Sequence, residues 1–184
     1  RYIDVAGASF RSFIEGKLDA LPGERPTLDD WSDHLTTLFP EVRLKRFLEM
    51  RGADGGRWRR ICALPAFWVG LLYDEQALDA AWHYVEGWTA EERQGLRNGV
   101  PRLAFETPFR DTTVWQIALD VLHIARGGLR RRAEVSPFGQ DETLYLEPLF
   151  ELVHERKTVA DELLERYHGS WNGSVDPIFV ELAF

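Results

Sequence analysis

The chain of 184 residues is 45% apolar and contains seven tryptophans, so we expect one folded domain with a sizeable core rather than a disordered chain. Its formal net charge of −8 argues against general nucleic-acid binding, because neutralising phosphates requires a basic surface or stripe. Cys62 is the single cysteine, which excludes an internal disulfide and suits a reducing compartment, and no run of about 20 apolar residues is present to span a membrane. We therefore expect a cytoplasmic protein that binds neither nucleic acid nor membranes.

Residues 1–56 are predicted to contain two short helices followed by a strand. Apolar residues at helical spacing predict a helix over residues 9–18, and Thr27 with Asp30 three residues later is typical of the N-cap of a second helix. Residues 42–51 read as one β-strand, and the glycines that follow it as a turn. Two or three strands near the start of a chain rarely stand alone, because exposed edges pair with something, so we expect the missing partner strands upstream of the chain or in a second copy.

Residues 57–184 read as a helical segment. Capping residues, glycines and apolar periodicity predict helices over residues 58–72, 74–88, from Thr89 onward, 111–124 with an end at Gly127–Gly128, 141–154, from Thr158 to Gly169, and 175–182. The two segments together predict a helix-rich α+β fold, with a few antiparallel strands near the N-terminus followed by helices, in a single domain.

The most informative stretch lies between residues 43 and 54, because charged residues alternate along the predicted strand. Alternation would place Arg43, Lys45, Glu49 and Arg51 on one face. Buried charges cost several kcal/mol unless they are paired or ligated. A metal ion on Glu49 and a phosphate clamped by Arg43 or Arg51 would explain such a face. The alternative is a solvated edge with a Glu–Arg surface pair worth ~0–1 kcal/mol.

Other candidate sites are weaker. The histidines lack the spacing of a zinc site, and only His34 is retained as a candidate because it lies just before the charged strand. The basic run 130–132 is interpreted as a helix end that compensates the helix dipole. Gly52 with the pair at 55–56 could cradle a phosphate, but it lacks the Lys-Ser/Thr ending of a Walker motif.

Several blocks of the sequence resemble the glutamate–cysteine ligases of plants and proteobacteria. The blocks run over residues 31–43, 47–56 and 59–74, and the similarity continues through residues 107–111 to residues 174–179. The resemblance covers nearly the whole chain. Those enzymes are considerably longer, so it implies a C-terminal portion, which agrees with a chain that opens at Arg1 as if in mid-domain.

The resemblance also implies a partial glutamine-synthetase-like fold, in which a curved antiparallel sheet carries metal-binding carboxylates and phosphate-binding arginines. The recurrent Glu-x-Arg-x-x-Asp motif is here Glu49, Arg51 and Asp54. It implies that Glu49 ligates a Mg²⁺ ion bridging the phosphates of ATP, and that Arg51 contacts the transferred phosphate or the glutamyl group. The full expectation is a metal ligand at Glu49, catalytic arginines at Arg51 and Arg43, and substrate or phosphate binding by Arg51, Arg43, Lys45, Asp54 and His34.

The implied reaction is the first step of glutathione biosynthesis. ATP phosphorylates the γ-carboxylate of glutamate, and the amine of cysteine then displaces phosphate to give γ-glutamylcysteine. We expect the chain alone to be inactive, because the other metal carboxylates would come from the upstream remainder of the same chain. Two alternatives stay open: a non-catalytic domain that binds an acidic metabolite or a protein, and a carboxylate–amine ligase that uses another amine.

Two residues depart from the family's pattern. Arg57 stands where the family usually has proline after the glycine pair, and Ala20 stands where plant members carry a redox-switch cysteine. No disulfide switch is therefore expected within this segment.

Overall fold

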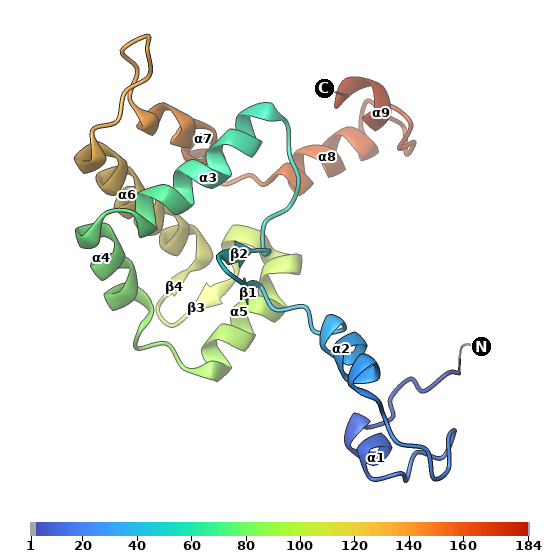
Figure 1. Ribbon diagram of the computed structural model, residues 1–184. Coiled ribbons are helices and arrows are strands. Elements are labelled where there is room, and N and C mark those ends of the chain that lie inside the picture. The colour runs from blue at the N-terminus through green and yellow to red at the C-terminus, as the bar shows by residue number, and fades with distance from the viewer. Residues whose placement is uncertain (1–2, 184) are drawn as a thin grey trace. The chain divides into compact units, whose positions relative to one another are not determined.

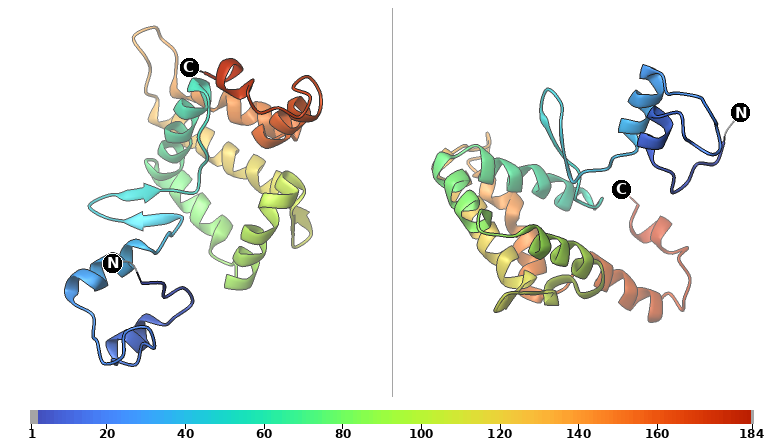
Figure 2. Two further views of the ribbon diagram at one scale, coloured as in Figure 1. Left: turned by 90° about the vertical axis from the view of Figure 1, so that its right-hand side faces the viewer. Right: turned by 90° about the horizontal axis from the view of Figure 1, so that it is seen from below.

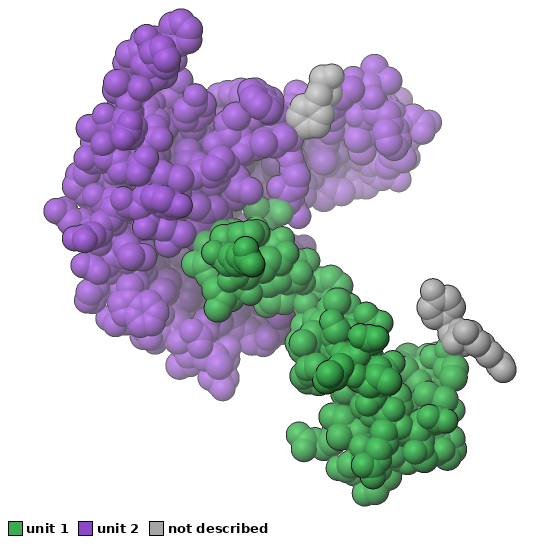
Figure 3. Space-filling model, viewed as in Figure 1, with its two compact units in different colours: residues 1–53 green, residues 54–184 purple. Residues whose placement is uncertain are grey.

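The computed structural model describes residues 3–183 (Figure 1). The chain divides into two compact units, residues 1–53 and residues 54–184, which are coloured separately in Figure 3. Helices predominate and two small antiparallel sheets accompany them, which confirms the helix-rich α+β class. Among the described residues, no helix is long and apolar enough to cross a membrane.

The first unit contains two capped helices and one hairpin. Helix α1 (Phe10–Ile14) precedes α2 (Leu28–Thr36), and strands β1 (Val42–Leu44) and β2 (Leu48–Met50) follow. The N-cap predicted at Thr27 is confirmed, and it forms a full capping box, because Thr27 and the N3 carboxylate exchange hydrogen bonds with each other's backbone N–H groups. Local hydrogen bonding thus fixes the start of this helix.

The single strand predicted over residues 42–51 is wrong. The segment folds back on itself as an antiparallel hairpin, in which Arg43 lies opposite Glu49 and Leu44 opposite Leu48 (Figure 2). The turn is closed by a hydrogen bond of 2.9 Å from the Lys45 N–H to the Phe47 carbonyl. Folding back lets each half satisfy backbone groups that a lone strand would leave unpaired, and alternation alone cannot reveal this turn.

The second unit consists mainly of helices, together with one two-stranded sheet. Its elements are α3 (Trp58–Leu72), α4 (Glu75–Val85), α5 (Ala90–Leu103), η1 (Ala104–Glu106), β3 (Pro108–Phe109), β4 (Thr112–Thr113), α6 (Val114–Arg132), η2 (Glu142–Leu146), α7 (Glu147–Glu155), α8 (Val159–His168) and α9 (Ile178–Glu181). The predicted helix over residues 141–154 is split into η2 and α7, and Pro148, which has no N–H to donate, lies in the first turn of α7. The last predicted helix is shorter than expected.

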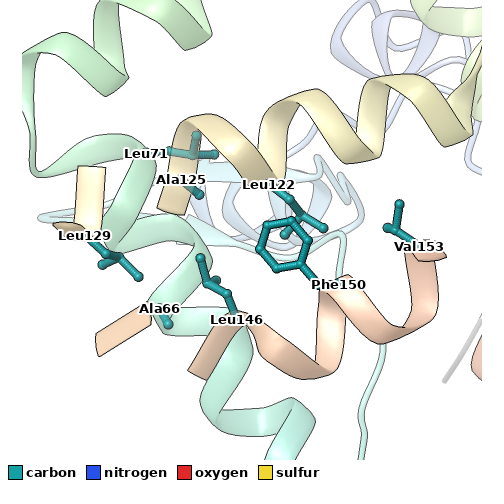
Figure 4. Packing of buried hydrophobic residues seen from close by; sticks show 8 residues of the cluster. All are labelled: Ala66, Leu71, Leu122, Ala125, Leu129, Leu146, Phe150 and Val153. Carbon is teal, nitrogen blue, oxygen red and sulfur yellow. The ribbon is translucent and has the colours of Figure 1, made fainter. Parts of the chain in front are cut away.

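The core of this unit lies where α3, α6 and α7 meet (Figure 4). Small and branched apolar side chains fill it, and aromatic residues pack around its edge. The buried cluster comprises Ala66, Leu71, Leu122, Ala125, Leu129, Leu146, Phe150 and Val153. Burying one such large apolar side chain contributes about 1.5–3 kcal/mol, so this cluster holds α3, α6 and α7 together.

Helix α6 contradicts the predicted end at Gly127–Gly128. It starts after Thr113 and runs through both glycines to Arg132. A Cβ atom on Gly128 would lie 1.9 Å from the carbonyl oxygen of Gly70 in α3. The glycine therefore permits a close crossing of two helices instead of terminating one, which a local pattern cannot distinguish.

The basic end of α6 is held by ion pairs within the second unit. Arg131 contacts Asp74 at 2.6 Å, and Arg132 contacts Glu142 at 3.2 Å. The predicted structural role of residues 130–132, at a helix C-terminus that favours cations, agrees with these contacts.

Candidate functional site

The β1–β2 hairpin brings together most of the predicted site residues. Arg43 and Glu49 are cross-strand partners, so their side chains share one face of the hairpin, and both are half-buried. Leu44 and Leu48 form the next pair and face the opposite side. The hairpin therefore has one polar face and one apolar face.

Glu49 presents a buried carboxylate oxygen without a hydrogen-bond partner. Its side chain is 36% exposed as a whole, yet Oε2 itself is buried and accepts no hydrogen bond from the described residues. The Lys45 Nζ atom lies 3.6 Å from Oε2, which is within ion-pair range. A buried carboxylate oxygen without a hydrogen bond is costly, and a metal ion bound there would offset the part of that cost that the ion pair with Lys45 leaves.

The Glu49 carboxylate suits one coordination position of a magnesium ion whose other ligands come from elsewhere. Mg²⁺ is usually held by one or two carboxylates together with phosphate oxygens and waters, and Glu49 can supply one such carboxylate. Within residues 3–183, no group of three or more His, Cys, Asp or Glu side chains is arranged to hold a metal ion. Glu49 therefore fits the ion as one ligand of a site that needs further ligands.

Arg43 on β1 and Arg51 directly after β2 have capacity to bind oxyanions. Arg43 donates from Nη2 to the Leu38 carbonyl at 3.4 Å, and the Arg51 guanidinium lies 5.6 Å from the centre of the Phe39 ring. A guanidinium carries five N–H donors, so a single carbonyl or ring contact leaves several for a phosphate or a carboxylate. The Arg51 backbone also donates to the Glu41 carbonyl at 2.7 Å, which continues the pairing beyond β2.

His34 and Asp54 are placed differently from the hairpin residues. The His34 ring stacks on Phe10 with 4.2 Å between ring centres and also lies 5.7 Å from the Trp31 ring. These contacts make His34 part of an aromatic cluster of the first unit. Asp54 is exposed and is the first residue of the second unit.

A concave region of the second unit was not anticipated from the sequence. It lies at the start of α3 and is lined partly by Arg57, Arg59 and Arg60 together with Arg166 from α8. The local signal was the Arg-Trp-Arg-Arg run directly after the glycine pair. The contribution of α8 had no local signal, because it lies about a hundred positions later in the chain.

Comparison with known proteins identifies the family. Residues 4–181 match Glutamate-cysteine ligase family 2 (GCS2). The chain belongs to this family. It is 56% identical over 184 residues to a chloroplastic glutamate–cysteine ligase of Nicotiana tabacum, an alignment that covers 100% of this chain and 34% of that protein.

Two further relatives give the same picture. The chain is 54% identical to a chloroplastic glutamate–cysteine ligase of Arabidopsis thaliana and 52% identical to glutamate–cysteine ligase A, chloroplastic, of Oryza sativa subsp. indica. Each alignment covers the whole chain, but 34% and 36% of the respective relative. The chain thus spans about a third of the length of the curated relatives it matches, and the resemblance stated from the sequence is confirmed.

The expected cytoplasmic location is contradicted by these relatives. They are named as chloroplastic proteins, which points to a plastid. The expectation rested on a lone cysteine, and the composition of a folded segment carries no targeting address.

Proposed function

We propose that this chain forms part of an ATP-dependent glutamate–cysteine ligase that joins the γ-carboxylate of glutamate to the amine of cysteine, the first step of glutathione biosynthesis. The observation that carries the proposal is the hairpin of this family member, on which Glu49, whose Oε2 accepts no hydrogen bond from the described residues, lies on the same face as Arg43. A carboxylate that needs a cation, beside guanidinium groups that bind oxyanions, suits phosphoryl transfer.

In this proposal, some residues of the hairpin bind the metal ion and others bind the phosphate. Glu49 would hold Mg²⁺, which, when bound, neutralises the charge on the phosphate oxygens of ATP. Arg43 and Arg51 would orient the oxygens of the transferred phosphoryl group, so that the glutamate carboxylate can attack the γ-phosphate. Lys45 balances the Glu49 charge at 3.6 Å. The cysteine amine then displaces phosphate from the glutamyl phosphate to complete the amide.

The remainder of the full-length protein is the proposed partner of the apolar hairpin face. Leu44 is 80% exposed and Leu48 54% exposed, and two short strands alone are marginally stable in water. Additional strands would cover these side chains and bring the missing metal carboxylates. We therefore expect this chain alone to be inactive.

The test is a Glu49→Gln variant of the full-length protein. Glutamine keeps the shape of the side chain but is a poor ligand for Mg²⁺, so glutamate- and cysteine-dependent ADP release should fall ~10²–10³-fold. The melting temperature should stay near that of the wild type, because no described group donates a hydrogen bond to Oε2. Glu134→Gln, which removes an exposed loop carboxylate from the second unit, is the matched control and should keep full activity.

Turnover by Glu49→Gln close to that of the wild type would refute the metal role. A screen of amines with ATP and glutamate separates cysteine from other acceptors. Absence of ADP formation with every amine would instead favour a non-catalytic domain that binds an acidic metabolite or a protein.

A further inference from the structure

The concave region at the start of α3 has a volume of about 520 Å³ and an excess of positive charge. It lies entirely within the second unit, between the first turn of α3 and parts of α7 and α8. Four arginines and two glutamates contribute to its wall, in a chain whose formal net charge is −8. These residues are Arg57, Arg59, Arg60, Arg166, Glu151 and Glu162.

Three of the four arginines have a carboxylate partner, and Arg166 pairs with Glu181 at 3.4 Å. Arg59 contacts Glu151 at 2.9 Å, and Arg60 contacts Glu162 at 3.1 Å. The last two ion pairs connect α3 to α7 and α8 and therefore have a structural role. They also hold both guanidinium groups at the wall of the pocket, where they can share their remaining N–H donors with a ligand.

Arg57 is different because its partner carries no charge. Its Nη2 donates to the backbone carbonyl of Glu181, whereas the Glu181 carboxylate contacts Arg166 at 3.4 Å. A carbonyl orients a guanidinium without neutralising it. Arg57 is thus positioned at the pocket with its charge available to an anion.

The backbone at this position adds to the attraction for anions. Arg57 is the N-cap of a helix of 15 residues, and its side chain makes no capping hydrogen bond to the first N–H groups of that helix. Such N–H groups and the helix dipole favour a negative group, and Gly55 and Gly56 just before them leave the backbone accessible. The pocket thus combines guanidinium groups from two helices with free backbone donors.

We propose that this pocket binds the phosphate group of a small molecule, with Arg57 as its main cationic contact. A phosphate has several acceptor oxygens and up to two negative charges, which match convergent guanidinium groups better than a single carboxylate does. The proposal goes beyond the ligase reaction and does not depend on Glu49. The phosphate can be inorganic, or it can belong to a nucleotide.

Isothermal titration calorimetry of this chain in a low-salt, phosphate-free buffer tests the proposal, with inorganic phosphate, pyrophosphate, ADP and adenosine as probes. Arg57→Pro removes the charge and suits the backbone, because the φ angle at this residue is −64° and proline requires a similar value. It should weaken binding about tenfold, as expected for the loss of one charge-assisted contact. Arg93→Gln, which removes the same charge from an exposed position on α5, should leave the affinity unchanged.

A variant of opposite sign makes the test sharper. Glu151→Gln removes the carboxylate that neutralises Arg59 and should tighten phosphate binding. If the ion pairs of the pocket only connect helices, this substitution would not increase the affinity for phosphate. Circular dichroism checks the fold of each variant, and Arg57→Ser, which places a favourable N-cap residue at the same position, replaces Arg57→Pro if proline prevents folding.

The probes distinguish the sources of the phosphate. Binding of inorganic phosphate and pyrophosphate supports a site for free phosphate, and binding of ADP alone supports a nucleotide. Three results would overturn the proposal. They are equal binding of adenosine and ADP, equal affinity of the wild type and Arg57→Pro, and absence of binding by every phosphate probe.

Discussion

Replacing Gly128 by alanine is expected to destabilise the second unit strongly, because this residue lies at the crossing of α3 and α6. The added methyl group would lie 1.9 Å from the Gly70 carbonyl oxygen and 3.0 Å from the Ala77 Cβ. Contacts between carbon and a carbonyl oxygen are normally about 3.3 Å or longer. The nearest atom belongs to the backbone of a helix, so rotation of a side chain cannot relieve the overlap.

The size of the effect follows from two opposing terms. Overpacking a tight core costs typically about 1–3 kcal/mol and occasionally more, and an overlap with backbone lies at the upper end of that range. Alanine is better than glycine inside a helix by about 1 kcal/mol, which offsets part of the cost. We expect a net loss of about 2 kcal/mol, equivalent to a drop of roughly 4–8 °C in melting temperature for a chain of this size.

Thermal and urea unfolding followed by circular dichroism measure this loss, with Gly127→Ala as the matched control. A Cβ on Gly127 meets only the flexible end of Arg131 at 3.4 Å, so this neighbouring substitution should be neutral or stabilising by up to about 1 kcal/mol. If Gly128→Ala proved as stable as Gly127→Ala, the close crossing of the two helices would be refuted.

Two further predictions concern titratable groups in the second unit. The Arg110 guanidinium and the Thr89 backbone hold the pKa of Glu92 at about 2, below its ordinary value of 4.5. The ionised carboxylate therefore stabilises the folded state above about pH 4.5, and this contribution is lost as the pH falls toward 2. The difference in melting temperature between wild type and Glu92→Gln should therefore shrink between these pH values, and a constant difference would contradict the role of the ion pair. Burial and a hydrogen bond to Asp120 raise the pKa of Tyr84 to about 12, so Tyr84→Phe should remove a step near that pH from the tyrosinate absorbance titration. An unchanged titration curve would show that Tyr84 is not held in this way.

Features governed by local chemistry were predicted well. The helix over residues 58–72 has the bounds expected from its sequence, and the boxes at Thr27, Thr89 and Thr158 all cap their helices. Each capping box depends on residues within one turn of each other, so the sequence contains all the information needed. Gly128 was misread as the end of a helix because its role depends on a contact with α3, which is distant in sequence.

The candidate site was predictable only in part, for the same reason. Alternation placed Arg43 and Glu49 on one face, and they do share a face, but through pairing across a hairpin instead of along one strand. The roles of Glu49 and Arg51 in binding metal and phosphate remain predictions that rest on family resemblance. The pocket beside α3 could not be foreseen, because Arg57 and Arg166 come from helices far apart in the chain.

The exposed apolar face of the hairpin has a consequence for handling the protein. Leu44 and Leu48 lie on two short strands whose outer edges present unpaired backbone groups, and such edges are templates for pairing with another chain. A preparation of this chain by itself is therefore expected to self-associate at high concentration through strand addition. A charged residue at position 44 would oppose that pairing and keep the chain monomeric for the binding measurements.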